Sequence, residues 1–155
     1  HAVFKQDPRA LVDISTWGHT VDTSVLASFE YAVVSIGVPL VVVLGHDDCP
    51  AMRAARQAWE QAQLPDGAMR ATVEHALMSM VRRGASGDSV ASVTVAHIVE
   101  TGLSLVQRSP ELARRIDAQE CGIVCATYSS EERRLRVHAT IGAVDETSDA
   151  LVECV

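Results

Sequence analysis

The spacing of apolar residues predicts a chain that alternates helices and strands. A period of three to four residues over 23–36 predicts a helix that a residue among 22–24 can cap and that Gly37 ends. Two continuous runs rich in β-branched residues, Pro39–Leu44 and Gly122–Tyr128, are typical of buried parallel strands. Helical patterns fill the interval between them, over about residues 51–63, 68–83, 89–108 and 110–119.

Two more segments have the spacing of strands. Leu11–Thr16 fits a short strand after a turn at Asp7-Pro8, and the polar–apolar alternation of Arg134–Thr140 is typical of an edge strand. A last helical turn is expected after Asp145. Since strands that alternate with helices build parallel sheets, we expect one α/β domain: a central, mostly parallel sheet flanked by helices, with an antiparallel edge strand.

Composition narrows the class of protein. The 155 residues suffice for one domain with a sizeable core, and 48% of them are apolar. With 13 basic and 20 acidic residues, the net charge of −7 argues against a nucleic-acid partner. The longest apolar run, Val38–Gly45, is far shorter than the roughly 20 residues that span a bilayer, so no membrane segment is expected in this chain. The cysteines are too few and too scattered for a disulfide framework, which favours the cytoplasm: Cys49, Cys121, Cys125 and Cys154.

The loop after the Pro39–Leu44 run carries the first chemical signal. Ligands of parallel α/β sheets bind at the carboxyl ends of strands, and His46 and Cys49 lie at such an end. Imidazole and thiolate both bind zinc, and the start of the following helix favours a thiolate. On its own, such a pair more often marks a polar loop histidine and a small buried cysteine. The remaining candidates have weaker contexts: Cys121 and Cys125 in the core, His75 and His97 at helix surfaces or in packing, and His138 on the edge strand.

A longer stretch gives this loop its context. Gly18–Val33 opens with Gly-His-Thr and contains Ser28-Phe-Glu-Tyr-Ala32, and Val38–Cys49 ends in Gly45-His-Asp-Asp-Cys49. In order and spacing these motifs resemble the β-class carbonic anhydrases, which have an Ala-Gly-Asn/His turn, a Ser-x-Glu-Tyr-Ala helix and a Gly-His-x-x-Cys-Gly zinc loop. The resemblance extends over nearly the whole chain, through Phe4–Pro8, Gly122–Tyr128 and Arg134–Gly142.

The resemblance implies a zinc enzyme. His46 and Cys49 fall on the family's second and third zinc ligands, and the first belongs to a Cys-x-Asp-x-Arg motif that is expected shortly before His1. The aspartate and arginine that hold and gate the zinc-bound water are expected there as well. Residues 1–155 are therefore expected to form a single β-carbonic-anhydrase-like domain without its N-terminal arm and first zinc-ligand strand. In this chemistry Zn²⁺ lowers the pKa of its bound water, and the resulting hydroxide attacks carbon dioxide to give bicarbonate.

The resemblance also implies a pocket and an assembly. Val12, Trp17, Gly18 and Tyr31 fall on pocket-wall positions, while plain core packing is the alternative interpretation of each. The small-molecule partners implied are carbon dioxide and bicarbonate. Because the family lines its pocket across a dimer interface, a homodimer or tetramer is expected.

Substitutions within the matched region depart from the family. Ser15 replaces an arginine, Trp17 replaces a small residue, and Pro50 replaces a glycine whose N–H contacts the substrate anion in the family. Losing such a donor costs ~10²–10³ in rate in other enzymes. These departures leave alternatives open: a weakened or inactive dimerisation or regulatory domain, or a carbonyl sulfide or carbon disulfide hydrolase. A generic domain that binds a small anion is a third, although the sequence has no glycine-rich phosphate loop.

Overall fold

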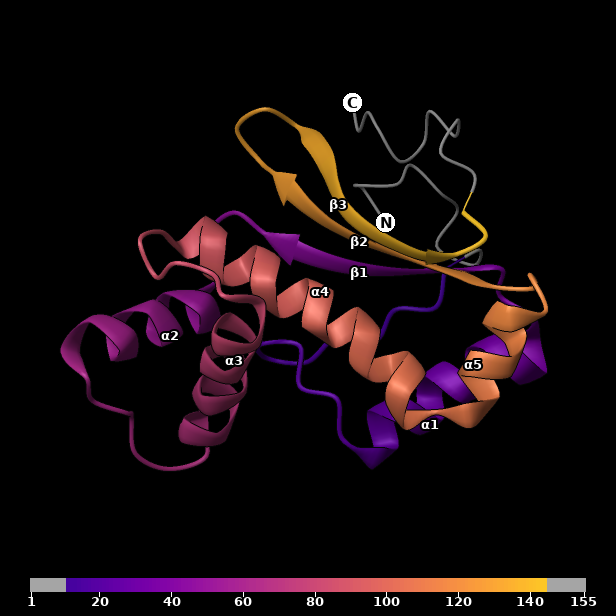
Figure 1. The fold of residues 1–155 in the computed structure, drawn as a ribbon, viewed down its shortest axis with the longest axis horizontal. Coiled ribbons are helices and arrows are strands. Elements are labelled where there is room, and N and C mark those ends of the chain that lie inside the picture. The colour runs from indigo at the N-terminus through magenta and orange to yellow at the C-terminus, as the bar shows by residue number, and fades with distance from the viewer. Residues whose placement is uncertain (1–10, 145–155) are drawn as a thin grey trace.

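A computed structural model describes residues 11–144, which fold into a small sheet with helices packed along it (Figure 1). In chain order the elements are α1 (Thr23–Glu30), η2 (Tyr31–Ile36), β1 (Leu40–His46), α2 (Pro50–Gln61), α3 (Met69–Arg83), α4 (Val90–Arg108), α5 (Pro110–Asp117), β2 (Gly122–Ser129) and β3 (Arg134–Gly142). The expected alternation of helices and strands is confirmed, with boundaries close to the predicted ones. The helical turn expected after Asp145 lies outside the described residues.

The first helix forms as its sequence predicts, with one local change. Asp22 caps α1, because its carboxylate accepts a hydrogen bond of 2.9 Å from the backbone N–H of Val25. From Tyr31 the helix continues as the wider π-helical turn η2. Gly37 then ends it in a left-handed conformation with φ of 83°, which glycine adopts without a steric penalty.

The sheet is mixed and has the strand order β1-β2-β3. β1 and β2 run parallel, with Leu40 opposite Gly122 and His46 opposite Tyr128. β3 pairs antiparallel with β2 across a bulge at Cys125 and Ala126. The predicted antiparallel edge strand is therefore confirmed, and the α/β class with it.

The longest helix, α4, is the centre of the core. It runs beneath the sheet and contacts β1, β2, α2, α3 and α5 (Figure 1). Gly102 lets this helix approach β2, since a Cβ there would lie 2.6 Å from the Cys125 sulfur. By length and composition α4 is the one described helix that could span a bilayer, and half of its apolar window is buried inside the protein. That burial is what a central core helix requires.

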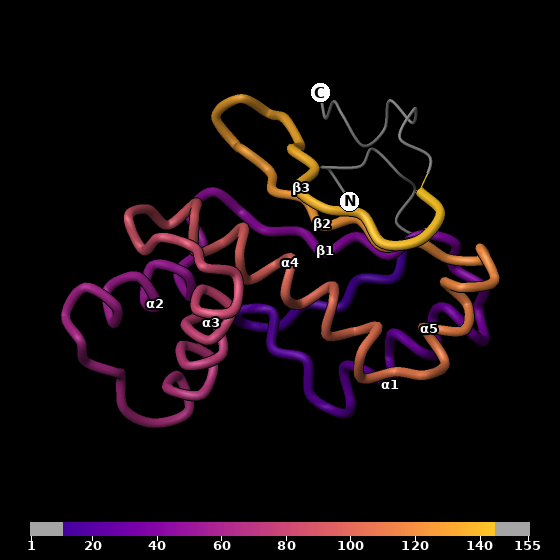
Figure 2. Tube along the Cα trace, in the orientation of Figure 1, coloured from indigo at the N-terminus to yellow at the C-terminus, as the bar shows by residue number. Residues whose placement is uncertain are grey.

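One predicted element does not form. Residues 11–16 are in neither a helix nor a strand, although a strand was expected at Leu11–Thr16. A strand needs a hydrogen-bonded neighbour, and within the described residues β1 pairs only with β2. The segment instead leads toward α2 and α3 and then turns back to α1, as the indigo trace in Figure 2 shows.

Candidate functional site

The two predicted metal ligands lie at the carboxyl end of β1. His46 is the last residue of the strand and is exposed. Cys49 occupies the N-cap position of α2 with extended backbone and is half-buried. Pro50 is the first residue of that helix, where its fixed φ suits the first turn and the missing N–H breaks no helical hydrogen bond.

The donor chemistry of this pair fits zinc, but the pair is incomplete. Cys49 is a free thiol, and within residues 11–144 neither its sulfur nor the His46 ring takes part in a side-chain hydrogen bond. One imidazole and one thiol are typical zinc donors, and a zinc site uses at least three protein ligands. Among the described residues no third His, Cys, Asp or Glu side chain completes a metal-binding group. His46 and Cys49 are therefore two of the donors that a zinc site would need, and we call this pair the half-site.

A tight turn, Trp17–Thr20, packs beside this half-site. Gly18 and His19 both have left-handed backbone, with φ of 74° and 56°. A histidine in this region pays roughly 1–2 kcal/mol in backbone strain. Side-chain hydrogen bonds from Thr16 to the Thr20 carbonyl and from Thr20 to the Trp17 carbonyl, at 3.2 and 3.3 Å, close the turn.

Gly18 is the point at which the turn meets the helices. A Cβ on this residue would lie 2.3 Å from Cγ2 of Thr72 on α3 and 3.1 Å from Cβ of Ala51, in the first turn of α2. Ala51 is two residues beyond Cys49, so the turn and the Gly45–Cys49 loop lie against each other. Only glycine provides both the backbone conformation and the space that this contact requires.

Two histidines bind the backbone of these two segments. Nε2 of His19 donates to the carbonyl of Leu44 on β1 at 2.6 Å, and Nε2 of His97 on α4 donates to the carbonyl of Gly18 at 2.7 Å. The other ring nitrogen of His97 accepts from the Ser79 hydroxyl at 2.9 Å. The two imidazole rings meet edge to face, with centroids 6.1 Å apart.

Burial keeps both of these rings neutral. It lowers the pKa of His97 to about 4, against the opposing effect of its bond to the Gly18 carbonyl. It also lowers the pKa of His19, where the bond to Leu44 opposes the shift and the neighbouring His46 adds to it. Nδ1 of His19 is buried and has no hydrogen-bond partner among the described residues.

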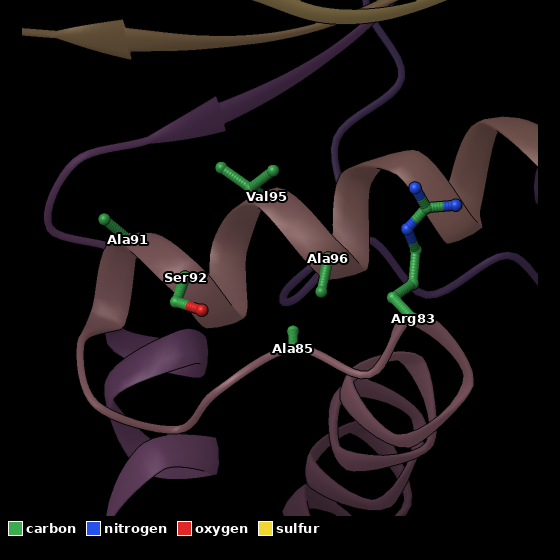
Figure 3. Close-up of a pocket in the computed structure, with 6 residues that line it drawn as sticks. All are labelled: Arg83, Ala85, Ala91, Ser92, Val95 and Ala96. Atoms are coloured by element: carbon green, nitrogen blue, oxygen red, sulfur yellow. The ribbon is translucent and has the colours of Figure 1, made fainter.

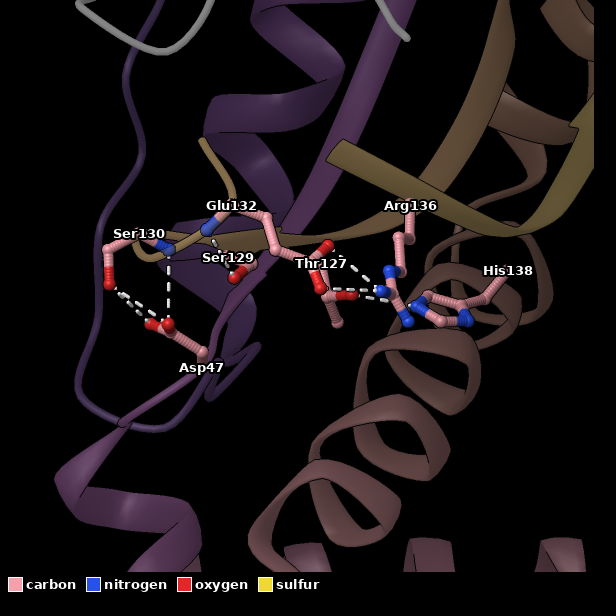
Figure 4. Close-up of polar contacts among 7 residues, drawn as sticks. All are labelled: Asp47, Thr127, Ser129, Ser130, Glu132, Arg136 and His138. Carbon is pink, nitrogen blue, oxygen red and sulfur yellow. Dashed lines mark hydrogen bonds and ion pairs between the residues drawn. The ribbon is translucent and has the colours of Figure 1, made fainter. Parts of the chain in front are cut away.

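The Gly45–Cys49 loop is held on its other side by Asp47. Its carboxylate accepts from the backbone N–H of Ser130 at 3.0 Å and from the Ser130 hydroxyl at 2.9 Å (Figure 4). These hydrogen bonds lower the pKa of Asp47. In the same view, Thr127 on β2 contacts His138 on β3 at 2.7 Å. The loop that follows β1 is thus fastened to the hairpin that follows β2.

The structure brings the predicted pocket residues only partly together. Gly18 and its neighbour Trp17 lie beside the Gly45–Cys49 loop, and Trp17 is 43% exposed. Val12 is exposed as well. Tyr31 is 63% exposed and begins η2, which packs against α5 at the end of the sheet opposite the carboxyl end of β1 (Figure 1). One copy of the described chain therefore does not place Tyr31 beside His46.

A shallow hollow between α3 and α4 does not coincide with this chemistry. It has a volume of about 350 Å³ and is drawn in Figure 3. Arg83 is its charged residue, and Glu100 lies 3.8 Å from the guanidinium. Since its lining includes neither His46 nor Cys49, we assign no substrate to it. The lining residues are Arg83, Ala85, Ala91, Ser92, Val95 and Ala96.

The sequence did not single out His19 or Ser79 as site residues, and it placed His97 at a helix surface or in packing. The packing interpretation of His97 is the correct one, since the residue is buried, but its partner is the Gly18 backbone. The Gly-His pair of the turn was a usable signal for His19, because histidine is enriched in left-handed backbone. No spacing rule links Ser79 or His97 to a turn so far away in the sequence.

Sequence comparison places the chain among known proteins. Residues 1–135 match the family model described as carbonic anhydrase. Carbonic anhydrase 2 of Mycobacterium tuberculosis is 37% identical over 145 residues, which are 93% of this chain and 70% of that protein. A carbonic anhydrase of Mycolicibacterium smegmatis is 34% identical over the same shares.

Structural comparison agrees at the level of the fold. The β-carbonic anhydrase of Coccomyxa, solved with acetazolamide, superposes with a TM-score of 0.74 at 16% identity, covering 97% of this chain and 70% of that one. A structure from the study of two tetrameric β-carbonic anhydrases of Sordaria macrospora gives 0.64 at 15% identity, over 79% and 64%.

Proposed function

Because the chain belongs to the β-class carbonic anhydrase family, we propose that it hydrates carbon dioxide reversibly to bicarbonate, with zinc held by His46 and Cys49. The family is one of enzymes, the carbonate dehydratases. The observation that carries the proposal is the pair of uncommitted donors at the carboxyl end of β1, next to the Gly18 turn. When bound, zinc makes hydroxide available from water near neutral pH.

His46 and Cys49 need a third donor, and we propose that a Cys-x-Asp-x-Arg segment outside the described residues supplies it. The state of β1 supports this. It is an apolar strand whose second edge has no hydrogen-bonded neighbour among the described residues, and Val41 and Val43 are buried in it. Exposed apolar edges favour pairing with another strand. A strand on this edge would also bring its side chains close to His46.

The residues around the half-site supply the rest of the site. Asp47 and the Gly18 turn fix the two sides of the ligand loop, so that His46 and Cys49 meet an ion without large rearrangement. The exposed rings of Trp17 and Tyr31, together with Val12, support a pocket that a second copy of the chain completes. We therefore propose a homodimer or a tetramer.

The free thiols of Cys49, Cys121 and Cys125 support a reducing compartment, the cytoplasm.

One observation favours a second candidate, a weakened or inactive relative of these enzymes. Pro50 begins α2 directly after Cys49 and has no N–H to offer an anion at the half-site. Where such a donor is lost, the rate falls by ~10²–10³ in other enzymes. A domain of this kind would keep the fold and the assembly but lose turnover.

The test combines metal content with turnover in the full-length protein. We expect elemental analysis to find one zinc per subunit and stopped-flow measurements to show carbon dioxide hydration. Cys49→Ser and His46→Asn should each lower zinc content and reduce hydration by about a thousandfold, because hydroxide is no longer formed near neutral pH. His75→Gln, on an exposed face of α3, is the matched control and should change neither quantity.

The outcomes separate the two candidates. Zinc-free, inactive wild-type protein contradicts the proposal. Zinc-bound protein with hydration at only a small fraction of a typical carbonic anhydrase supports the weakened relative. Hydrolysis of carbonyl sulfide in place of carbon dioxide hydration would reassign the substrate.

A further inference from the structure

A chain of buried hydrogen bonds links α3, α4 and the Trp17–Thr20 turn through the core. It runs from the Ser79 hydroxyl on α3 to the His97 ring on α4 and ends on the Gly18 carbonyl. His97 is only 4% exposed, and a buried imidazole is costly unless its nitrogens are hydrogen-bonded. Both nitrogens of His97 have partners, so the ring is fully satisfied where it lies.

The partners determine how the protons are arranged. A carbonyl oxygen only accepts, so Nε2 of His97 carries the proton that binds Gly18. Nδ1 is then an acceptor and takes the hydroxyl proton of Ser79. The Ser79 oxygen also lies 3.1 Å from the carbonyl of His75, but it has a single proton to donate. In this arrangement the Ser79 hydroxyl donates to Nδ1 of His97, and the two hydrogen bonds hold the ring in one tautomer and one orientation.

His19 continues the connection to the zinc-ligand strand. It follows Gly18 directly, and its Nε2 donates to the carbonyl of Leu44, two residues before His46. Its backbone has φ of 56°, a strained conformation for any residue with a side chain. Strain of this kind persists only where the surroundings over-determine it, and here the hydrogen bonds of the Gly18 carbonyl and of the His19 ring do so.

We propose that His97 and His19 are positioning residues of the site. Together they hold the Trp17–Thr20 turn in one geometry against the end of β1, so that the pocket wall at Trp17 and Gly18 keeps a constant position relative to His46. Neither histidine touches the reacting atoms. The inference rests on the proposed function for its link to turnover, but the geometry of the turn can be measured without zinc or substrate.

The decisive comparison uses two buried hydroxyls on neighbouring helices. Ser79 and Thr101 each lie near the carbonyl four residues earlier, at 3.1 and 2.7 Å, and both are buried. Thr101 binds the backbone carbonyl of His97, and only Ser79 reaches the His97 ring. Ser79→Ala and Thr101→Val therefore remove similar hydroxyls from the core, and a purely structural role predicts similar effects for both.

The first readout is the turn itself. Hydrogen exchange of peptides that cover residues 17–20 should become about tenfold faster in Ser79→Ala and His97→Leu, since each removes a buried hydrogen bond. Trp59→Phe leaves Trp17 as the single tryptophan of the chain, so its fluorescence quenching by acrylamide reports the same turn. Thr101→Val should leave both measurements unchanged. His97→Gln keeps an N–H at a similar reach and should restore most of the protection.

The second readout is turnover of the zinc-loaded, full-length protein. His97→Leu and His19→Met should lower kcat by about tenfold to a hundredfold while zinc content stays at the wild-type level, because a displaced pocket wall misplaces the substrate. His19→Gln should recover part of the loss. A merely structural role would instead lower the yield of folded protein and leave kcat per zinc unchanged.

The results decide the inference independently of the proposed function. Unchanged exchange and quenching in both Ser79→Ala and His97→Leu, or an equal change in Thr101→Val, overturns it. If the wild type binds no zinc and shows no turnover, the proposed function fails, and the exchange and quenching measurements alone decide whether the histidines hold the turn.

Discussion

The turn Trp17–Thr20 and the loop Gly45–Cys49 lie against each other, but buried side chains hold the turn and an exposed side chain holds the loop. His97 binds the Gly18 carbonyl of the turn and is itself held by Ser79; both side chains are buried, and neither belongs to the candidate metal donors. The loop is anchored at its rim by Asp47, while His46 and Cys49 have no side-chain hydrogen bonds within residues 11–144. Rigidity is thus concentrated next to the donors, which remain free to bind.

The difference shows how the proposed metal site could be preorganised while its donor side chains stay without hydrogen bonds. A donor that is already hydrogen-bonded must lose that bond before it binds a metal, whereas a neighbour can be rigid at no such cost.

The largest effect is expected from crowding the turn. Gly18→Ala places a Cβ 2.3 Å from Thr72 in left-handed backbone and should destabilise the protein by about 3 kcal/mol, as overpacking and backbone strain add. Gly37→Ala is the control: its φ is 83°, but nothing lies within 4 Å of the added carbon. It should cost only about 1 kcal/mol. Urea unfolding of both variants measures the difference, and equal losses would show that Thr72 yields.

Acid should destabilise the protein through the buried anchor of the turn, His97. His97 has its pKa lowered to about 4 from an ordinary 6.5, so the unfolded chain binds more protons between these values. Stability present at pH 7 is therefore lost as the pH falls from about 6.5 to 4, by about 3 kcal/mol in all. Urea midpoints across this range measure the slope, which His97→Gln should reduce. An unreduced slope would assign the acid sensitivity to other groups.

Restoring a backbone donor to the loop should raise turnover. Pro50→Ala returns an N–H beside Cys49 and should increase kcat about tenfold or more if an anion is stabilised there. Pro110→Ala changes the same helix position at the start of α5 and should leave kcat unchanged. Stopped-flow hydration of the two zinc-loaded variants makes the comparison. No gain in Pro50→Ala would mean that another departure from the family limits the rate.

The smallest effect is expected from breaking the contact between Asp47 and Ser130 at the edge of the loop. Asp47→Ala removes the acceptor of both Ser130 hydrogen bonds and should make hydrogen exchange at residues 129–131 a few-fold faster. Asp48→Ala removes only an exposed ion pair with Arg53 and should change nothing measurable. Exchange at the Trp17–Thr20 turn should stay constant in both variants, because its anchors are separate. A change in the turn would mean that the two segments are coupled through the loop.

Much of the fold could be predicted from local pattern. The apolar runs predicted β1 and β2, and Gly37 predicted the end of the first helix. These features are local, since a few consecutive residues determine them. Leu11–Thr16 was wrongly predicted as a strand because strand formation depends on a partner, which local pattern does not contain.

The candidate site came from residues that are close in sequence, and it stays a prediction. His46 and Cys49 are one short motif, and the family resemblance added Trp17, Gly18, Val12 and Tyr31 as predictions. The anchors of the turn were not predictable, because their contacts join α3 and α4 to a segment far from them in the chain. A buried histidine and a surface histidine look alike in a single sequence, and only tertiary packing distinguishes them.

The order of the elements along the chain has a consequence for biosynthesis. The turn and β1 are translated early, but their partners, His97 on α4 and the parallel strand β2, come much later. Such long-range pairings are slow to form, and the apolar strand β1 stays uncovered until they do. The nascent chain should therefore depend on chaperones while the ribosome is still translating α4.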